Sequence, residues 1–224
     1  MGWKTIYSIT QKDFQNMYNA GQYNWGDHSI FSMTYSGQTI WGAGKWSQSS
    51  SPLMLSPKLP HRPGTKTRIT IKFFAIWETN VTGEVDVGVI FFKDGDTCKT
   101  PEGKDYFYGY GRVEATSHPD YGAFHTVVVE QENNTITITI DGKDPLTRSL
   151  EPPLNTVVVA SRFLDVVAPT PDVYIGYLIT DVTIEYYDIW EDIMNQITSM
   201  MNMMIWIMIA VVGISLFIRL FKKE

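Results

Sequence analysis

Apolar side chains alternate with polar or small ones over much of the chain between residues 69 and 186. A period of two places successive side chains on opposite faces of a β-strand. In the segment 69–77 the odd-numbered residues are all apolar, whereas the even-numbered residues are polar only at the start. Similar segments, separated by turns rich in Gly, Asn and Asp, are 84–92, 107–113, 126–130, 135–140, 157–160 and 173–186. Short strands at this spacing predict an all-β fold with two antiparallel sheets.

The segments 126–130 and 135–140 have the pattern of a β-hairpin whose strands are joined by the polar residues 131–134. Alternation assigns one side of the hairpin to the core and exposes Thr137 and Thr139 on the other. The side chains expected to be buried are Val127, Val129, Ile136, Ile138 and Ile140.

Residues 1–27 are interpreted as an N-terminal extension with one short helix. Thr10 and Asp13 have the spacing of a capping box, which marks the start of a helix. An apolar stripe follows at Phe14, Met17 and Tyr18. The β-sandwich is then expected over residues 28–188.

The C-terminal part of the chain contains a long apolar segment. No charged residue occurs from Ile193 to Ile218, and about 20 helical residues cross a hydrocarbon core of about 30 Å. Because the segment is apolar all round, it predicts a single transmembrane helix. The helix and its flank are expected over residues 189–219, and a short basic tail over 220–224. The alternative is a buried core helix. The residues expected within the span include Met203, Ile205, Trp206, Ile209, Val212, Ile214, Leu216 and Phe217. The flanking residues are Trp190, Asp192, Arg219, Lys222 and Lys223.

The first residues have no apolar segment typical of a signal peptide, so we expect a tail-anchored protein. The basic residues after the span favour a cytoplasmic C-terminus, whereas a domain made without a signal peptide would itself stay in the cytoplasm. A capsid protein of a virus with an internal membrane is a third arrangement. Its domain, made in the cytoplasm, faces the shell, and its basic tail faces the genome. The sequence leaves these three arrangements open.

Two segments carry a resemblance to a known family. The segment 125–143, HTVVVEQENNTITITIDGK, resembles the hairpin of concanavalin A-like and laminin-G-like jelly-roll domains. The segment 174–187, YIGYLITDVTIEYY, resembles their closing strand. The resemblance covers residues 28–188 and implies a two-sheet jelly-roll sandwich. It implies binding more often than catalysis, because one fold hosts many functions.

Glu84 and Asp86 resemble part of the Glu-x-Asp-x-x-Glu strand of the glucanases that share this fold. Strand alternation would place both carboxylates on one face, as a retaining glycosidase requires. Val89 occupies the position of the third acid, so the set is incomplete. We therefore interpret the two acids as the solvated edge of a strand.

Two further groups of residues are candidates for ligand binding. Asp94 and Asp96 flank Gly95 and could bind Ca²⁺, although a simple acidic turn explains them as well. Several aromatic side chains could stack on a sugar or, instead, fill the core and edges of the sandwich. These aromatic candidates are Trp41, Trp46, Tyr106, Tyr108 and Tyr110.

Composition narrows the function classes. The formal net charge of −6 argues against nucleic acid as a partner of the main domain. The single cysteine, Cys98, excludes an intrachain disulfide framework. Residues 181–192 contain five acids and no base, so this part of the chain is not expected to bind anionic lipid headgroups. We expect no cofactor.

These patterns predict a non-enzymatic structural protein anchored in a membrane by one C-terminal span. The favoured role is a capsid or envelope component of a virion, whose jelly roll packs against further copies or neighbouring capsid or envelope proteins, because almost no stalk precedes the span. The alternative is an adhesion or glycan-binding module displayed on a cell surface. A hydrolase of the glucanase type is a third, less favoured possibility.

Overall fold

The computed structural model describes residues 2–61, 65–77, 81–92, 108–114, 122–143, 145–149, 156–172 and 174–222. The chain forms two compact units, Lys4–Tyr186 and a second unit that combines Met1–Trp3 with Tyr187–Glu224. The elements in chain order are β1 (Trp3–Ile9), α1 (Gln11–Asn19), β2 (Asn24–Trp25), β3 (His28–Tyr35), β4 (Gln38–Ser47), β5 (Met54–Leu55), β6 (Thr67–Trp77), β7 (Thr82–Phe92), β8 (Tyr108–Glu114), β9 (Ala123–Glu132), β10 (Thr135–Ile140), β11 (Leu146–Ser149), β12 (Thr156–Val167), β13 (Ile175–Tyr187) and α2 (Ile189–Phe221).

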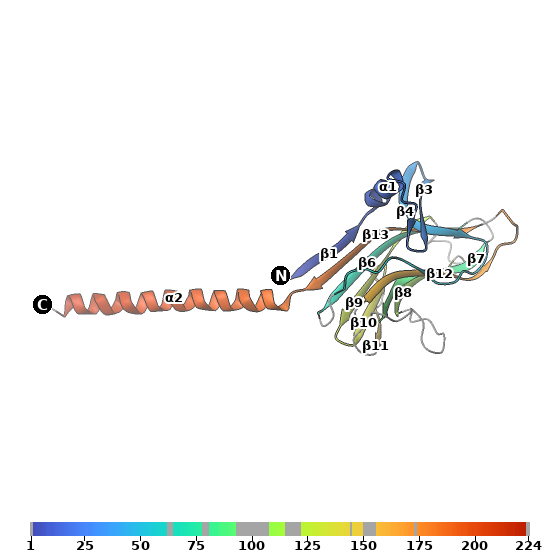
Figure 1. The fold of residues 1–224 in the computed structure, drawn as a ribbon. Helices are drawn as coiled ribbons and strands as arrows, with labels where there is room; N and C mark the ends of the chain where they lie inside the picture. Colours follow the sequence, from blue (N-terminus) through green and yellow to red (C-terminus); the bar gives the residue numbers. More distant parts are fainter. Residues whose placement is uncertain are drawn as a thin grey trace. The chain divides into compact units, whose positions relative to one another are not determined.

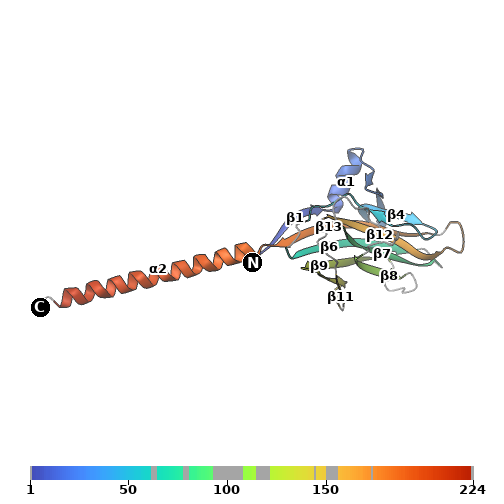
Figure 2. The ribbon, with the colours of Figure 1, turned by 60° about the horizontal axis from the view of Figure 1, so that its bottom comes forward.

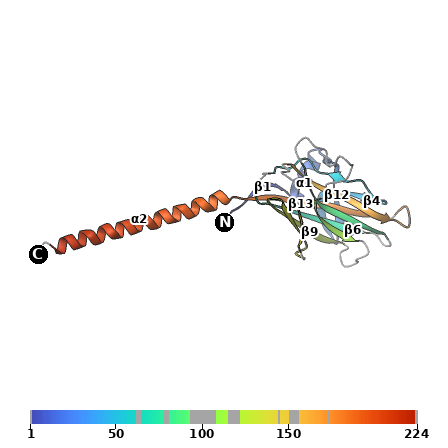
Figure 3. The same cartoon turned by 90° about the horizontal axis from the view of Figure 1, so that it is seen from below.

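The strands form two antiparallel sheets, as the sequence predicts. Among the described residues the larger sheet has nine strands in the order β11-β10-β9-β6-β13-β4-β3-β2, with β1 also paired to β13. The smaller sheet has the order β5-β12-β7-β8. In two views β12 and β7 of the smaller sheet lie alongside β13 and β6 of the larger one (Figures 1 and 2), and the view from below again places β12 beside β13 and β6 (Figure 3). The fold is therefore an all-β, two-sheet sandwich.

One core fills the space between the two sheets. The alternation in β6 directs Ile69, Ile71 and Phe73 into it, and none of these side chains is exposed to solvent. From the smaller sheet, β7 contributes Val85 and Val87 to the same cluster. Each such side chain stabilises the fold by roughly 1.5–3 kcal/mol when fully buried. The core face predicted for 69–75 is confirmed, while the side chain of Trp77 lies outside the described residues.

The predicted hairpin is formed by β9 and β10. Their register pairs Thr135 with Glu132 and Ile138 with Val129, so the turn is only the two residues 133–134. Asn133 adopts a positive φ of 53° there, a conformation that Asn tolerates better than most residues. Of the five side chains expected to be buried, four are buried, namely Val127, Val129, Ile136 and Ile138. The fifth, Ile140, is partly buried against the same core.

The N-terminal segment is more closely integrated into the sandwich than an extension would be. The predicted helix is present as α1, and the Asp13 carboxylate accepts hydrogen bonds from the Thr10 N–H at 2.8 Å and the Thr10 hydroxyl at 2.7 Å. Phe14 of α1 is fully buried against Trp25, with ring centroids 5.5 Å apart. Because β1 and β2 also belong to the larger sheet, residues from Lys4 onward form part of the sandwich unit.

The C-terminal helix α2 begins at Ile189, and only one residue separates it from the end of β13 at Tyr187. Its 27-residue segment Ile193–Arg219 is long and apolar enough to cross a membrane. The alternative of a buried core helix is wrong, since none of its most apolar window is buried within the chain. The residues expected within the span all lie in this exposed segment, from Met203 to Phe217. This helix is therefore a candidate membrane anchor.

A pair of substitutions on one strand tests the core assignment. Ile138→Asp would place an unpaired charge at a position that is only 4% exposed, and it would lose the burial of an apolar side chain worth roughly 1.5–3 kcal/mol. We expect this variant to unfold or to melt far below the parent chain, whose total stability should be roughly 5–15 kcal/mol. Thr139→Asp, on the other face of β10, should change the melting temperature by only a few degrees. Thermal melts followed by circular dichroism measure both, and equal losses would contradict the assignment of the two faces.

Candidate functional site

The side of the larger sheet that points away from the shared core is called the outer face here. It is exposed in part, and its side chains come from the alternate positions of β3, β4, β6, β9 and β13. Along β6 these positions begin with Arg68 and end with Phe74 and Ile76. The outer face thus divides into a charged half and an apolar half.

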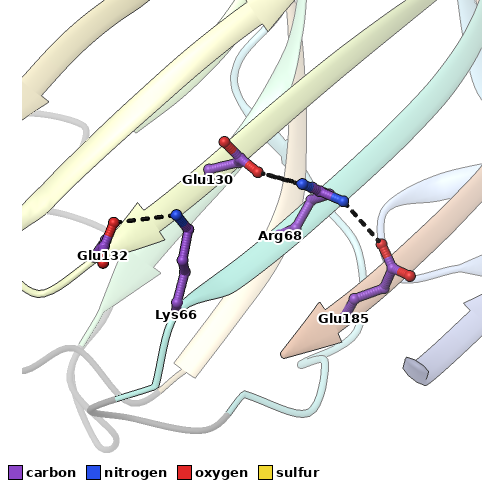
Figure 4. A network of polar contacts seen from close by, with 5 residues as sticks. All are labelled: Lys66, Arg68, Glu130, Glu132 and Glu185. Atoms are coloured by element: carbon purple, nitrogen blue, oxygen red, sulfur yellow. Dashed lines mark hydrogen bonds and ion pairs between the residues drawn. The ribbon is translucent and has the colours of Figure 1, made fainter. Parts of the chain in front are cut away.

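Ion pairs organise the charged half (Figure 4). Because β6 lies between β9 and β13 in the sheet, the register sets Arg68 opposite both Glu130 and Glu185. The Arg68 guanidinium donates from Nη2 to Glu130 Oε1 at 2.7 Å and from Nε at 2.8 Å, while its Nη1 lies 3.9 Å from Glu185 Oε2. Lys66 Nζ is 3.2 Å from Glu132 Oε2. These side chains are about one-third or more exposed in most cases, so each pair stabilises the sheet by no more than about 1 kcal/mol.

A shallow groove of about 370 Å³ lies beside this network. It is lined by Lys66, Glu130, Glu132, Asn133, Thr135 and Thr137. Carboxylates, hydroxyls and a side-chain amide can hydrogen-bond a hydroxyl-rich molecule. None of the lining residues is aromatic, so the groove has no ring on which a sugar could stack.

An aromatic patch occupies the other half of the outer face. Ile40, Phe74 and Leu178 form its buried base. The ring of Phe74 contacts the ring of Tyr35 at a centroid distance of 5.2 Å and that of Phe124 at 5.1 Å. Phe124 remains 49% exposed. The other members packed on the base, all partly buried, are Phe31, Met33 and Ile76.

Trp46 of β4 lies in the same row of the sheet as Ile76 of this patch, with Gly176 between them. It stands opposite Gly176 of β13, and a Cβ at Gly176 would lie only 2.6 Å from the Trp46 ring. The glycine therefore leaves room for the indole to lie against the sheet. Because Trp46 is still 36% exposed, it adds aromatic surface to the outer face.

Two of the predicted sugar-stacking residues, Trp41 and Trp46, have described side chains, and the structure does not bring these two together. Trp41 and Trp46 lie on opposite faces of β4, since Trp41 packs against the core. The Trp41 ring also contacts the ring of Tyr18 of α1 at a centroid distance of 5.2 Å, and the Trp41 backbone N–H donates to Gln11 Oε1 at 3.2 Å. The remaining candidates cannot be placed as side chains: Tyr108 and Tyr110 belong to β8 by their backbone, while Tyr106, Asp94 and Asp96 lie outside the described residues. Within the described part, no cluster of three His, Cys, Asp or Glu residues could hold a metal ion.

Asp86 is not on a solvated strand edge, which corrects the interpretation of Glu84 and Asp86. Its strand, β7, lies between β12 and β8, and the Asp86 side chain is fully buried. Arg162, directly opposite on β12, donates from Nε to Asp86 Oδ2 at 3.0 Å. Val89, at the position of a third acid, faces the core instead. The carboxylate therefore serves as the buried half of a cross-strand ion pair.

A chain of buried polar groups connects the two sheets. Sequence reasoning missed it because its members are far apart along the chain. His28 Nε2 lies 2.8 Å from Ser161 Oγ, which also contacts the Tyr177 hydroxyl. Since the carbonyl of Trp25 can only accept, His28 Nδ1 must be the donor across their 3.3 Å contact. The directions then follow: Tyr177 donates to Ser161, and Ser161 donates to His28 Nε2. We call this set the inter-sheet polar chain.

The environment of the inter-sheet polar chain keeps its members uncharged. Burial lowers the pKa of His28 to about 4 and raises the pKa of Tyr177 well above its usual range. Although a serine hydroxyl directed at a histidine resembles an activated nucleophile, all three side chains are fully buried. A substrate has no access to them, so the arrangement is structural.

Comparisons with known proteins found similarity in structure but not in sequence. The sequence matches no protein-family model and no curated protein. Among solved structures, the CBM2 module of the evolved Dit of Lactobacillus casei BL23 phage J-1 has 11% identity and a TM-score of 0.46, with 84% of this chain and 97% of that chain covered. The lectin UEA-II complexed with galactose has 11% identity and a TM-score of 0.41, with 73% and 92% covered. The β-glucanase of Bacillus licheniformis has 12% identity and a TM-score of 0.39, with 84% and 92% covered.

These neighbours are jelly-roll and lectin-like β-sandwiches, the class that the hairpin and the closing strand resemble. They comprise a phage module, a lectin and a glucanase. One fold can host many functions, so a likeness in shape alone assigns no function to this chain.

The low pKa of His28 predicts a particular pH dependence of stability. The unfolded chain binds a proton on this histidine near pH 6.5, whereas the folded chain does so only near pH 4. The stability that depends on neutral His28 is therefore complete above about pH 6.5 and is lost as the pH falls toward 4. Between pH 7.5 and pH 4.5 we expect His28 to account for a loss of about 2–3 kcal/mol in the free energy of unfolding.

Urea unfolding of the parent chain and of His28→Gln at both pH values measures this contribution. The variant should be less stable at pH 7.5 but should lose less stability on acidification, because its side chain does not titrate. Carboxylates contribute equally to both chains and cancel in the comparison. The same pH dependence in the two chains would contradict the assignment.

Proposed function

We propose that the protein is a non-enzymatic structural component anchored in a membrane, whose sandwich packs through its outer face against further copies. The observation that carries this proposal is the aromatic patch around Phe74, Phe124 and Trp46. Contiguous apolar surface on a soluble domain is characteristic of protein–protein contacts. The ion pairs of Arg68, at the other end of the same face, are consistent with the polar border of such an interface.

The candidate anchor supports the membrane part of the proposal. The segment Ile193–Arg219 has 27 residues, which is more than the roughly 20 that a hydrocarbon core requires. Arg219 ends this segment, Lys222 follows it and Trp190 precedes it, as expected at membrane interfaces. Only Asp188 separates β13 from α2, so the chain lacks the longer linker of receptors that must extend from a membrane. A capsid or envelope protein of a virion with a lipid membrane fits these features.

The buried acid on β7 supports a non-enzymatic role. A glycosidase needs two accessible carboxyl groups across a scissile bond. Asp86 is fully buried and paired with Arg162, and Val89 replaces the third acid. The pair Glu84 and Asp86 thus lacks the features of a hydrolytic site.

A membrane-displayed glycan-binding module is the second candidate function, and the polar groove beside β9 and β10 favours it. Its hydroxyl and carboxylate lining suits sugar hydroxyl groups, although it lacks an aromatic ring. Screening the domain on a glycan array, with Glu132→Gln as the matched variant, tests this function. A signal that the variant abolishes would favour it over the structural role.

Truncation tests the division into an anchored domain and an anchor. A chain that ends at Tyr187 should be soluble without detergent and should retain the circular dichroism of a β-protein, because none of the described side chains of α2 belongs to the core. The full chain should require detergent or lipid. Precipitation of the truncated chain in an unfolded form would show that α2 belongs to the fold of the domain.

A matched pair of surface substitutions tests the outer face. Phe124 is 49% exposed within the aromatic patch, and Leu146 is 48% exposed on β11, outside it. We expect the truncated chain to self-associate and expect Phe124→Glu to weaken this association at least tenfold, since a charge would be buried in the contact. Leu146→Glu should leave association unchanged. Sedimentation equilibrium measures both, and a parent chain that remains monomeric at high concentration would exclude packing between copies.

A further inference from the structure

The uncharged polar residues of α2 lie largely on one side of the helix. Asn195 and Asn202 are seven residues apart, which is close to two full turns, and Ser199 lies between them. Gly213 is eighteen residues from Asn195, or five turns, so it projects from the same line. We call this side the asparagine face; it also includes Trp206, Ile209 and Ala210.

The asparagine face extends into the predicted hydrocarbon region. The 27 residues Ile193–Arg219 have a length of about 40 Å at 1.5 Å per residue, whereas the hydrocarbon core is about 30 Å thick. With Arg219 at one boundary, about 20 residues reach back to Ser199. Asn202 then lies inside the hydrocarbon, and Asn195 lies at the headgroups. A side-chain amide in hydrocarbon is costly until it finds a hydrogen-bond partner.

No other part of the described chain covers this face. Trp206 and Ile209 are each more than half exposed, and none of the apolar window is buried inside the described part of the chain. The described residues include only one helix able to cross a membrane. Among the described residues no second span offers a partner to Asn202 at this depth, so we look for the partner on a second molecule.

A second copy of the same chain meets this requirement. All copies insert in the same direction, so they present Asn202 at the same depth in parallel helices. An asparagine amide both donates and accepts hydrogen bonds, which makes the pair Asn202–Asn202 self-complementary. Ile209 and Leu216 continue the seven-residue spacing toward the other end of the helix, and Gly213 permits close approach of two backbones.

We propose that two copies of the chain pair in the membrane through the asparagine face of α2, in parallel and in register. This inference rests on the proposed membrane anchoring. It assigns α2 the additional role of bringing two sandwiches together, independently of the outer face of the larger sheet. A repeated asparagine at one heptad position favours dimers in a single register.

Disulfide cross-linking of the full chain in phosphatidylcholine vesicles tests the pairing. The single native cysteine is first removed by Cys98→Ser, and one cysteine is then introduced by Ile209→Cys on the asparagine face or by Met204→Cys on the opposite side. Flotation of the vesicles in a density gradient reports separately whether the chain is membrane-bound. Mild oxidation followed by non-reducing electrophoresis gives the yield of dimers.

We expect the Ile209→Cys chain to cross-link several-fold more than the Met204→Cys chain. Adding Asn202→Leu should weaken dimerisation about threefold, the effect typical of one interhelical hydrogen bond in a membrane. The double change Gln196→Leu and Ser215→Leu is the matched control, because these polar residues project from other sides of the helix, and it should have no effect.

The outcomes separate the two proposals. A chain that does not float with the vesicles would overturn the membrane anchoring itself. A chain that floats but cross-links equally at positions 204 and 209 would overturn pairing through the asparagine face and leave the anchoring intact. A cross-link at 209 that is insensitive to Asn202→Leu would likewise overturn the role assigned to the asparagines.

Discussion

The burial of alternate apolar side chains between the two sheets is the constraint on which the sandwich depends. Each strand has only one set of residues available for the core, because successive side chains point to opposite faces. The inward set of β6, from Ile69 to Phe73, meets the inward set of β7 in a single cluster. The side chains on the outward face of each strand do not take part in this core, so their residue types can vary. The outer face could therefore acquire ion pairs at one end and aromatic rings at the other without disturbing the fold.

Two buried polar arrangements are compatible with this core because each satisfies its own hydrogen bonds. The inter-sheet polar chain passes from Tyr177 through Ser161 to His28 and ends on a backbone carbonyl. Asp86 and Arg162 pair across adjacent strands of the smaller sheet. Removing one member of either set would leave a buried group without its partner, which costs more than the intact interaction contributes. These residues therefore restrict the strands to one register as well as stabilising them.

Local patterns in the sequence were sufficient for the elements whose determinants are local. The alternation at 126–140 identified the hairpin and four of its buried residues, the capping box at Thr10 identified α1, and the apolar run identified α2. Features that depend on distant pairing were not accessible. The pairing of β1 with β13 joins segments more than 160 residues apart in the sequence, and the burial of Asp86 depends on which strands lie on either side of β7. No short motif encodes such neighbours, so the first strands and the ion pair were misjudged.

The candidate interface nevertheless left a trace in the sequence. Along β6 the outward positions change from Arg68, Thr70 and Lys72 to Phe74 and Ile76. On a strand exposed to water throughout, these positions would stay polar, so the change marks where the outer face ceases to be adapted to solvent. The register then explains why the change forms a patch: Phe74 lies opposite Phe124 of β9 and Leu178 of β13, and both neighbours are apolar. Apolar residues at the outward positions of one strand do not by themselves indicate a contact surface. They do so when the residues opposite them on the paired strands are apolar as well.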